Sequence, residues 1–114
     1  MEAEFINSVE TSFVKIFMAG DYERAKDICQ RYCSDVGLCV TVTSTSYVYK
    51  YGREEGFIAE LINYPRFPET QASLSGLAMT LADLLLYELD QGSYTIMTPF
   101  STSFYSRRDG DKKK

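Results

Sequence analysis

Hydrophobic residues near the N-terminus recur at spacings of three and four, the period of an amphipathic helix. In segment 4–19, phenylalanine, isoleucine and valine side chains would form one apolar face at this spacing. Segment 22–36 has the same pattern, with Asp21 as a suitable N-cap and Gly37 as a natural C-terminal stop. Two consecutive helices are therefore predicted at the start of the chain.

The strongest helical pattern lies in segment 70–91, where leucine and alanine residues form a wide apolar face. Thr70 or Ser73 is the expected N-cap, and Gly92 follows the predicted end. Gly76 stands inside this segment, where a glycine costs roughly 1 kcal/mol relative to alanine. We interpret Gly76 as the mark of a close crossing with another helix.

Between and after these helices the period changes to two, the period of a β-strand. A hairpin is predicted from strands at 38–51 and 57–64, joined by the glycine-bounded turn 51–56. A further strand is predicted at 93–98 and a short one at 102–107. The order α-α-β-β-α-β, with an optional last strand, predicts an α+β fold. Its small antiparallel sheet of three or four strands would pack against the helices.

The chain length and the distribution of charge predict one domain. The chain has 114 residues, which suit a single core, and we place that domain in residues 1–108. Residues 109–114, DGDKKK, are expected to form a disordered charged tail. The acidic N-terminal stretch holds no long apolar run, so neither a signal peptide nor a membrane span is predicted. A cytoplasmic protein is expected.

The composition excludes several classes of function. A net charge of −4 argues against a duplex nucleic-acid binder, because phosphate neutralisation needs a cationic surface. The chain has no histidine, which removes histidine triads, histidine general bases and histidine metal sites. Cys29, Cys33 and Cys39 alone make a poor zinc signature, so they are interpreted as reduced, buried, structural thiols. No cofactor and no metal is expected.

Residues 39–52 read CVTVTSTSYVYKYG and predict an unusual strand face. Every second residue places three threonines and three tyrosines on one side, from Thr41 to Tyr51. An ordinary solvated strand carries lysine, glutamate and arginine, whereas this one has a single charge, Lys50. Binding and oligomer surfaces lose charge at their centre, so we interpret this Thr/Tyr face as a surface for recognition or self-association. A plain solvent-facing strand is the alternative, since both residue types favour sheets.

Two further segments offer the same mixture of hydroxyl, ring and arginine side chains. NYPRFP, residues 63–68, is held stiff by two prolines, and TPFSTSFYSRR, residues 98–108, lies near the C-terminus. Tyrosine rings can stack on a base, and arginine forms charge-assisted bonds to phosphate. If the three segments converge, they would bind a small phosphorylated, nucleotide-like ligand. The candidate ligand-binding residues are Thr43, Thr45, Tyr47, Tyr49, Asn63, Arg66, Thr98, Ser101 and Arg107.

The acidic residues do not identify a catalytic pair. Glu54 and Glu55 fall in the predicted turn, where charge serves solubility, and Glu60 lies inside the second strand of the predicted hairpin. A carboxylate-pair enzyme needs two acids in different environments, and no spacing indicates such a pair. The sequence has no phosphate-binding loop, dinucleotide fingerprint or nucleophile elbow. No catalytic residue is predicted.

The block GLCVTVTSTSYVYKYGREEGFIAELINYPRFP, followed by a leucine-rich helix and QGSYTIMTP, resembles a family of small accessory proteins in tailed-phage genomes. The shared features are the GLCVTVT opening, the LINYPRFP close and a helix ending in Glu-Leu-x-Gln, over about residues 37–98. The resemblance implies a phage origin and a small accessory role, and it implies no chemistry. Small phage accessory proteins of this size often interfere with host defence or host enzymes.

These observations predict a phage anti-defence protein of the host cytoplasm that is not an enzyme. The first hypothesis is a sponge that binds and sequesters a host nucleotide-type immune signal without altering it. The alternative is an inhibitor that docks its Thr/Tyr face on a host defence protein. A third hypothesis is a hydrolase that uses Glu60 and a nearby acid. A homodimer or higher homo-oligomer is expected, because the charge-poor strand and the leucine-rich helix leave surface to cover.

Overall fold

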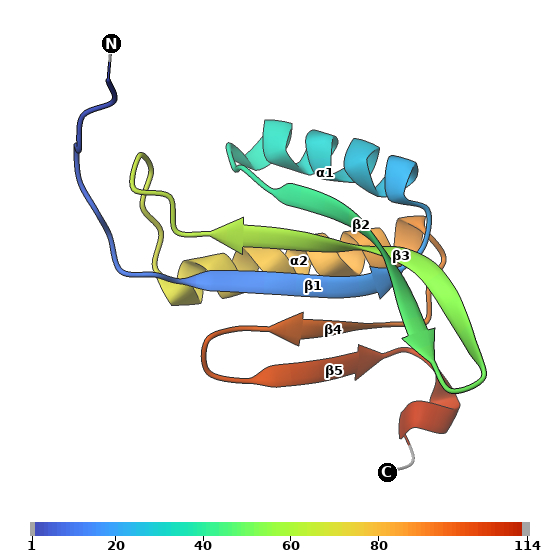
Figure 1. Ribbon diagram of the computed structural model, residues 1–114. Coiled ribbons are helices and arrows are strands. Elements are labelled where there is room, and N and C mark those ends of the chain that lie inside the picture. The colour runs from blue at the N-terminus through green and yellow to red at the C-terminus, as the bar shows by residue number, and fades with distance from the viewer. Residues whose placement is uncertain (1, 113–114) are drawn as a thin grey trace.

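The computed structural model describes residues 2–112 and shows two helices packed on one face of a five-stranded sheet (Figure 1). In chain order the elements are β1 (Phe13–Ala19), α1 (Tyr22–Val36), β2 (Thr41–Tyr49), β3 (Gly52–Ile62), α2 (Gln71–Glu88), β4 (Ser93–Met97), β5 (Thr102–Ser106) and η1 (Asp109–Lys112). Neighbouring strands are antiparallel and lie in the order β2-β3-β1-β4-β5. The predicted α+β fold with an antiparallel sheet is confirmed, whereas the sheet has five strands in place of three or four.

The first element is a strand, so the helix predicted at 4–19 is wrong. Strand β1 is central in the sheet and has apolar residues on both of its faces. Val14 and Ile16 are buried beneath the helices, while Phe13 and Phe17 lie half-buried on the opposite face. Together the apolar residues of the two faces produce spacings of three and four, because a strand with apolar residues on both faces shows no clear polar alternation. The element order therefore begins β-α and not α-α.

Both helices begin at capped positions that the sequence predicts. The Asp21 side chain accepts a hydrogen bond from the backbone N–H of Arg24 at 3.1 Å, and Gly37 ends α1 in the left-handed region at φ 71°. The Thr70 hydroxyl accepts from the backbone N–H of Ser73 at 3.1 Å at the start of α2. These bonds satisfy amides that have no partner inside the helix, and they confirm Thr70 as the N-cap.

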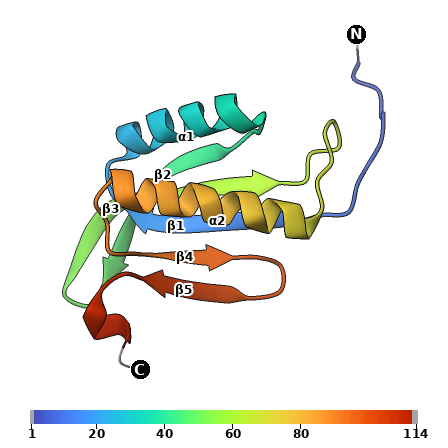
Figure 2. The same ribbon diagram turned by 180° about the vertical axis from the view of Figure 1, so that it is seen from behind.

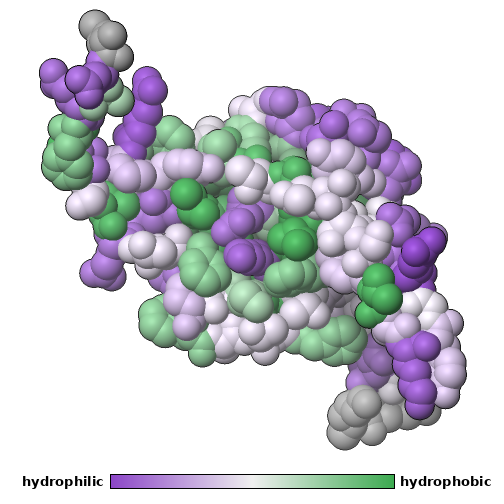
Figure 3. Space-filling view, in the orientation of Figure 1, coloured by the Kyte–Doolittle hydropathy of each residue, from purple (hydrophilic) through white to green (hydrophobic). Residues whose placement is uncertain are grey.

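The core fills the space between the sheet and the two helices, which Figure 2 shows in front of the strands. Its largest fully buried side chains are Phe57, Ile16, Leu61, Leu74, Leu81, Leu85 and Val14. Within residues 2–112, no helix covers the other face of the sheet, which we call the open face (Figure 1). The open face mixes apolar and hydrophilic side chains (Figure 3), so it is a surface and not a second core.

The β2–β3 hairpin turns at residues 50–51, so the turn predicted at 51–56 is wrong. Glu54 consequently lies inside β3, directly across from Tyr47 of β2. Strand β1 pairs with β3 only as far as Gly56. The outer part of the hairpin therefore extends past the end of β1, and it bends toward the C-terminal segment (Figure 1).

The C-terminal segment contains a short 3-10 helix. It spans Asp109–Lys112, inside the tail 109–114 for which the sequence predicts disorder, and residues 113–114 lie outside the described residues. Among the helices formed by residues 2–112, none is long and apolar enough to cross a membrane.

Gly76 does not mark a helix crossing, because the space around it is open. A Cβ built at Gly76 meets no described atom within 4 Å outside its own helix, and the residue is exposed. We expect Gly76→Ala to raise the free energy of unfolding by about 0.5–1 kcal/mol, since alanine is the better helix former. Urea unfolding followed by circular dichroism measures the change. A midpoint equal to or below that of the parent would contradict the open environment.

The buried thiol of Cys29 makes the fold sensitive to alkaline pH. Burial, with a smaller contribution from Cys33, raises the pKa of Cys29 from 9.0 to about 12. The unfolded chain loses this proton first, so the stability contributed by the buried thiol is complete below pH 9 and falls as the pH rises toward 12.

We therefore expect Cys29→Ala to flatten the alkaline loss of stability, and Cys39→Ala, at an exposed thiol, to leave it unchanged. Urea midpoints of the parent and both variants at about pH 8 and about pH 10.5 measure the slopes. Identical slopes in all three proteins would contradict the role of burial at Cys29.

Candidate functional site

The predicted Thr/Tyr strand is β2, which forms one edge of the sheet with its Thr/Tyr side on the open face. Thr43 lies across from Ile58 and Thr45 across from Gly56 of β3. Thr43 and Tyr49 are exposed and Thr45 is half-buried. The face is therefore available, and it belongs to a broader surface that includes β3 and β1.

Asn63 and Arg66 lie in the loop that follows β3, and the structure gives Asn63 a structural task. Its amide donates to the backbone carbonyl of Glu10 at 2.8 Å, and its carbonyl accepts from the backbone N–H of Glu69 at 2.7 Å. These bonds hold the loop to the N-terminal segment. Arg66 is exposed on the same loop.

Thr98 and Ser101 form the β4–β5 turn, and Arg107 follows β5 at its other end. The Thr98 backbone N–H donates to the Ser101 carbonyl at 2.9 Å, which closes the turn. The Arg107 guanidinium donates to the Gln91 carbonyl at 2.7 Å and pairs with Asp90 at 3.0 Å. Arg107 therefore already has partners in the loop before β4.

The strand register separates the predicted site residues into two groups at opposite ends of the sheet. The pairs Phe13–Ile62 and Lys15–Met97 define one end, and Ser93–Ser106 defines the other. Thr43 lies between these ends on β2, and Thr45 is level with Ala19 at the second end. Near the first end lie Asn63, Arg66, Thr98 and Ser101, and near the second lie Tyr47, Tyr49 and Arg107. The three segments do not converge on one point.

Tyr47 is the predicted residue with the most specific environment. Its hydroxyl donates to the Phe57 carbonyl at 2.6 Å and accepts from the Met18 backbone N–H at 3.1 Å, so it joins β2 to both β3 and β1. The ring passes over Gly56, where a Cβ would stand 2.7 Å from Tyr47 Cε2 and 2.4 Å from the Met18 carbonyl oxygen. Burial raises the pKa of Tyr47, against a smaller lowering by the Met18 hydrogen bond. The phenol therefore stays neutral at physiological pH.

A hollow of about 230 Å³ opens beside Tyr47, where β1 ends and β4 begins. Three parts of the chain form its walls: the end of β1, the extended part of the hairpin, and the start of β4 with the residue after Arg107. The lining residues are Phe17, Met18, Ala19, Tyr47, Glu54, Gln91, Ser93, Tyr94, Thr95 and Arg108. We call this the Tyr47 hollow.

Glu54 supplies a carboxylate to the Tyr47 hollow that nothing in the fold uses. Its carboxylate is exposed and makes no hydrogen bond or ion pair with any residue of 2–112. Its neighbour Glu55 points to the other face of β3 and accepts from the Ser46 hydroxyl at 2.9 and 2.8 Å. Two adjacent glutamates thus have different environments, and only Glu54 lines the hollow.

Arg108 supplies a guanidinium to the same hollow. Its Nη1 donates to the Ser93 hydroxyl at 3.1 Å and lies 3.2 Å from the Asp111 carboxylate. The guanidinium lies against Gly92, where a Cβ would come within 2.4 Å of Nε. The side chain is 57% exposed, so it can still offer bonds to a ligand carboxylate.

The arrangement suits a ligand that carries both charges and a flat ring. Phe17 and Tyr47 give the hollow aromatic walls, on which a base can stack and a cation can rest. The Tyr94 ring is buried on the helix side of the sheet, where its hydroxyl donates to Asp83. Glu54 can attract a positive centre, and Arg108 can bind a carboxylate. Within the described residues, no group of three metal-binding side chains lies close enough to hold an ion.

Sequence reasoning missed Glu54 and Arg108 for identifiable reasons. With the turn placed at 51–56, Glu54 was assigned to a solvated loop, whereas a two-residue turn at 50–51 pairs position 54 with Tyr47. Arg107 was chosen over Arg108, and only the fold shows that Arg108 lines the hollow.

Two other candidate sites have weaker chemistry. Glu60 lies on the open face between Lys15 and Thr41, with no second acid across from it, so the predicted hydrolase pair is not formed there. The three cysteines border a groove between α1 and β2. Of these thiols only Cys29 is buried, which corrects the expectation of three buried thiols.

Solved structures of a phage SAM lyase share this fold. The lyase in its apo state aligns with a TM-score of 0.70 at 10% identity, over 92% of this chain and 98% of that chain. The lyase in complex with S-methyl-5'-thioadenosine aligns with a TM-score of 0.61 at 10% identity, over 90% of this chain and 96% of that chain. No family model and no curated protein matches the chain.

The match to an enzyme along almost its whole length overturns the expectation that this protein is not an enzyme. The fold match likewise gives no support to a non-catalytic sponge. That expectation rested on the lack of a recognisable catalytic motif, and such a lack is weak evidence when a fold matches at 10% identity.

The position of Tyr47 depends on the missing side chain of Gly56. We expect Gly56→Ala to lower the free energy of unfolding by about 1–3 kcal/mol, because the new methyl group overlaps backbone atoms of β1 as well as the Tyr47 ring. Gly52→Ala is the matched control on the same strand, since its Cβ would meet only the Tyr49 ring, at 3.5 Å or more. Urea unfolding measures both. Equal stabilities would show that Tyr47 does not pass closely over β3.

Proposed function

We propose that this protein is a phage enzyme that cleaves S-adenosylmethionine in the host cytoplasm and releases methylthioadenosine. The observation that carries the proposal is the Tyr47 hollow, which combines aromatic walls, an unused carboxylate and a guanidinium. The fold match to a SAM lyase supports it, since that lyase has been solved with S-methyl-5'-thioadenosine bound. Depletion of this methyl donor would serve the anti-defence role that the sequence predicts.

The groups of the hollow match the groups of the substrate one by one. S-adenosylmethionine has an adenine ring, a sulfonium cation, an ammonium group and a carboxylate. The aromatic side chains would stack on adenine, Glu54 would face the positive centres, and Arg108 would bind the carboxylate. Each charge-assisted hydrogen bond contributes about 1.5–3 kcal/mol.

The product fixes the bond that must break. Methylthioadenosine keeps the sulfur, its methyl group and the ribose, so the bond between sulfur and the γ-carbon of the methionine portion is cleaved. Its electron pair goes to sulfur, which becomes a neutral thioether. The γ-carbon then gains a new bond from within the substrate. In one route the carboxylate oxygen bonds to it and gives a lactone. In the other route the electron pair of a C–H bond on the adjacent carbon forms a double bond to it, which gives an alkene and a released proton. Both routes balance without added water, as the lyase class requires.

The lining of the hollow is mixed, because polar side chains such as Gln91 and Ser93 lie beside the Phe17 ring. A neutral thioether loses little hydration against such a ring, whereas a cation there loses more. Tyr47 acts as a positioning residue, since its hydroxyl is committed to the Phe57 carbonyl and the Met18 N–H.

The open face favours a second candidate function, the docking inhibitor that the sequence also predicts. Strand β2 has no charged residue, and Phe104 on β5 is 59% exposed. A charge-poor sheet face with exposed rings suits a protein partner. Such an inhibitor would leave S-adenosylmethionine intact, so the same assay separates the two functions. The predicted homo-oligomer is compatible with both and stays a prediction.

Incubation of the purified protein with S-adenosylmethionine, followed by liquid chromatography and mass spectrometry, tests the proposal. The parent should release methylthioadenosine. Glu54→Gln should lower kcat/KM roughly tenfold to a hundredfold, because it removes the carboxylate that would hold the cationic substrate in the hollow. Glu55→Gln is the matched control and should stay within about twofold of the parent, since substitutions on the far face of a strand have small effects.

The outcomes separate the function from the site. A parent that releases no methylthioadenosine would sink the enzyme proposal and leave the docking inhibitor. If the parent is active and the Glu54 and Glu55 variants have equal rates, the proposed activity stands but the Tyr47 hollow is not its site. Unchanged urea midpoints in both variants confirm that the comparison reports on chemistry.

A further inference from the structure

The N-terminal segment forms an extended arm that leaves the body of the domain (Figure 1). Two large apolar side chains on it, Phe5 and Ile6, are 82% and 81% exposed. The arm is held to the domain from residue 7 onward, where the Asn7 amide donates to the Pro65 carbonyl at 3.1 Å and the Glu10 carbonyl accepts from the Asn63 amide at 2.8 Å. Residues 2–6 are therefore the free part of the arm. No backbone N–H of residues 2–11 donates to a described acceptor. The arm thus has both apolar surface and backbone groups to offer.

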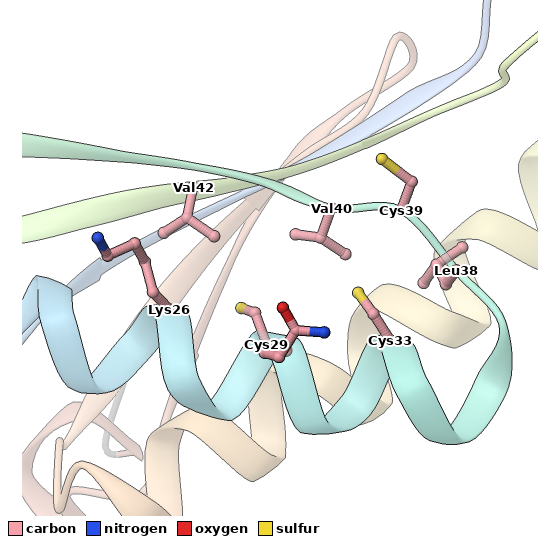
Figure 4. A pocket seen from close by; sticks show the side chains of 8 residues that line it. Lys26, Cys29, Cys33, Leu38, Cys39, Val40 and Val42 are labelled. Carbon is pink, nitrogen blue, oxygen red and sulfur yellow. The ribbon is translucent and has the colours of Figure 1, made fainter.

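A groove between α1 and β2 is lined largely by apolar side chains, and no described residue fills it. Its volume is about 390 Å³. Figure 4 shows Val42 of β2 and Val40, just before that strand, directed toward Cys29 and Cys33 of α1 across the groove. We call it the α1–β2 groove. It is wide enough for one large side chain from outside the domain.

The edge of the sheet beside this groove is open to pairing. Strand β2 is an outermost strand, so one side of its backbone has no neighbouring strand. Its nine residues, TVTSTSYVY, include neither a charge nor a proline. Natural edge strands usually carry such residues to prevent further pairing. Their absence on β2 leaves an edge that can accept an additional strand.

The free part of the arm and the β2 edge complement each other in charge, and the arm can pair with about half of β2. Five extended residues span about 16 Å, against about 30 Å for the nine residues of β2, at about 3.3 Å per residue. The free part of the arm carries Glu2 and Glu4 and no basic residue. Lys26 lines the α1–β2 groove, and its side chain is 43% exposed in a surface pair with Glu23. A surface pair of this kind exchanges partners at little cost.

We propose that the arm of one copy lies along β2 of a second copy, as an added strand that places Phe5 in the α1–β2 groove. Alternation along a strand then directs Ile6 toward the open face of that second copy. The arm lies apart from α1 of its own chain in both views (Figures 1 and 2). Every copy carries both an arm and a groove, so a twofold pair satisfies both arms at once. This exchange does not depend on the function of the Tyr47 hollow.

Sedimentation of the full chain gives the first test. The parent should be a dimer at micromolar concentration, and the double variant Phe5→Ser, Ile6→Ser should raise the dissociation constant about tenfold to a hundredfold. Phe100→Ser is the matched control, because Phe100 is 83% exposed on the distant β4–β5 turn. That variant should remain dimeric. A parent of 13.0 kDa, or an arm variant that associates like the parent, would overturn the proposal.

Disulfide capture identifies the contact itself. In a Cys39→Ser background, one copy carries Phe5→Cys and another carries Gln30→Cys, at the border of the groove. Mild oxidation of the mixture should give a mixed disulfide dimer, whereas Phe100→Cys with Gln30→Cys should give at least about tenfold less. Equal yields would overturn the exchange. A disulfide that forms only when positions 5 and 30 are altered in one chain would also overturn it, because the arm would then fold onto its own groove.

Discussion

The hydroxyl of Tyr47 lies between the two central strands of the sheet, and the geometry of the candidate site depends on it. It donates to β3 through the Phe57 carbonyl and accepts from β1 through the Met18 N–H. A tyrosine ring can reach this place only because Gly56 below it has no side chain. The contact holds the hairpin in a bend over the end of β1. The carboxylate of Glu54, which lies directly across from Tyr47 on β3, is thereby placed beside the hollow.

The charged side chains around the hollow differ in whether they have partners within the domain. Arg107 and Glu55 have partners within the domain, while Glu54 has none among the described residues and Arg108 is only partly engaged. A carboxylate without a partner beside the neutral Tyr47 ring is suited to a cation. The same fold occurs in a phage SAM lyase at 10% identity. A shared fold does not by itself imply a shared function, so the chemistry depends on the side chains that this chain has in the hollow.

The sequence predicts those parts of the fold that are governed by local contacts. The caps at Asp21, Gly37 and Thr70 determine where the helices begin and end, and each can be read from a few neighbouring residues. Strand β1 could not be read in this way, because apolar residues on both faces of a central strand resemble a helical pattern. Its true character depends on β3 and β4, which are distant in sequence and pair on either side of it.

The candidate site was harder to predict for the same physical reason. Tyr47 stood out in the sequence because of its charge-poor strand, whereas the role of Glu54 depends on the register of the hairpin. An error of a few residues in the turn moved Glu54 from a strand to a loop. Arg108 enters the hollow only because β5 pairs with β4 and returns the chain to Ser93. Long-range pairing of this kind leaves no local signal.

Titration of isotope-labelled protein with methylthioadenosine, followed by amide chemical shifts, tests the central claim most directly. The account predicts shifts concentrated around the Tyr47 hollow, at Met18, Glu54 and Ser93, with the amides of Gln30 and Cys33 in the α1–β2 groove unchanged. Shifts centred on the α1–β2 groove, or no shifts at millimolar ligand, would contradict it.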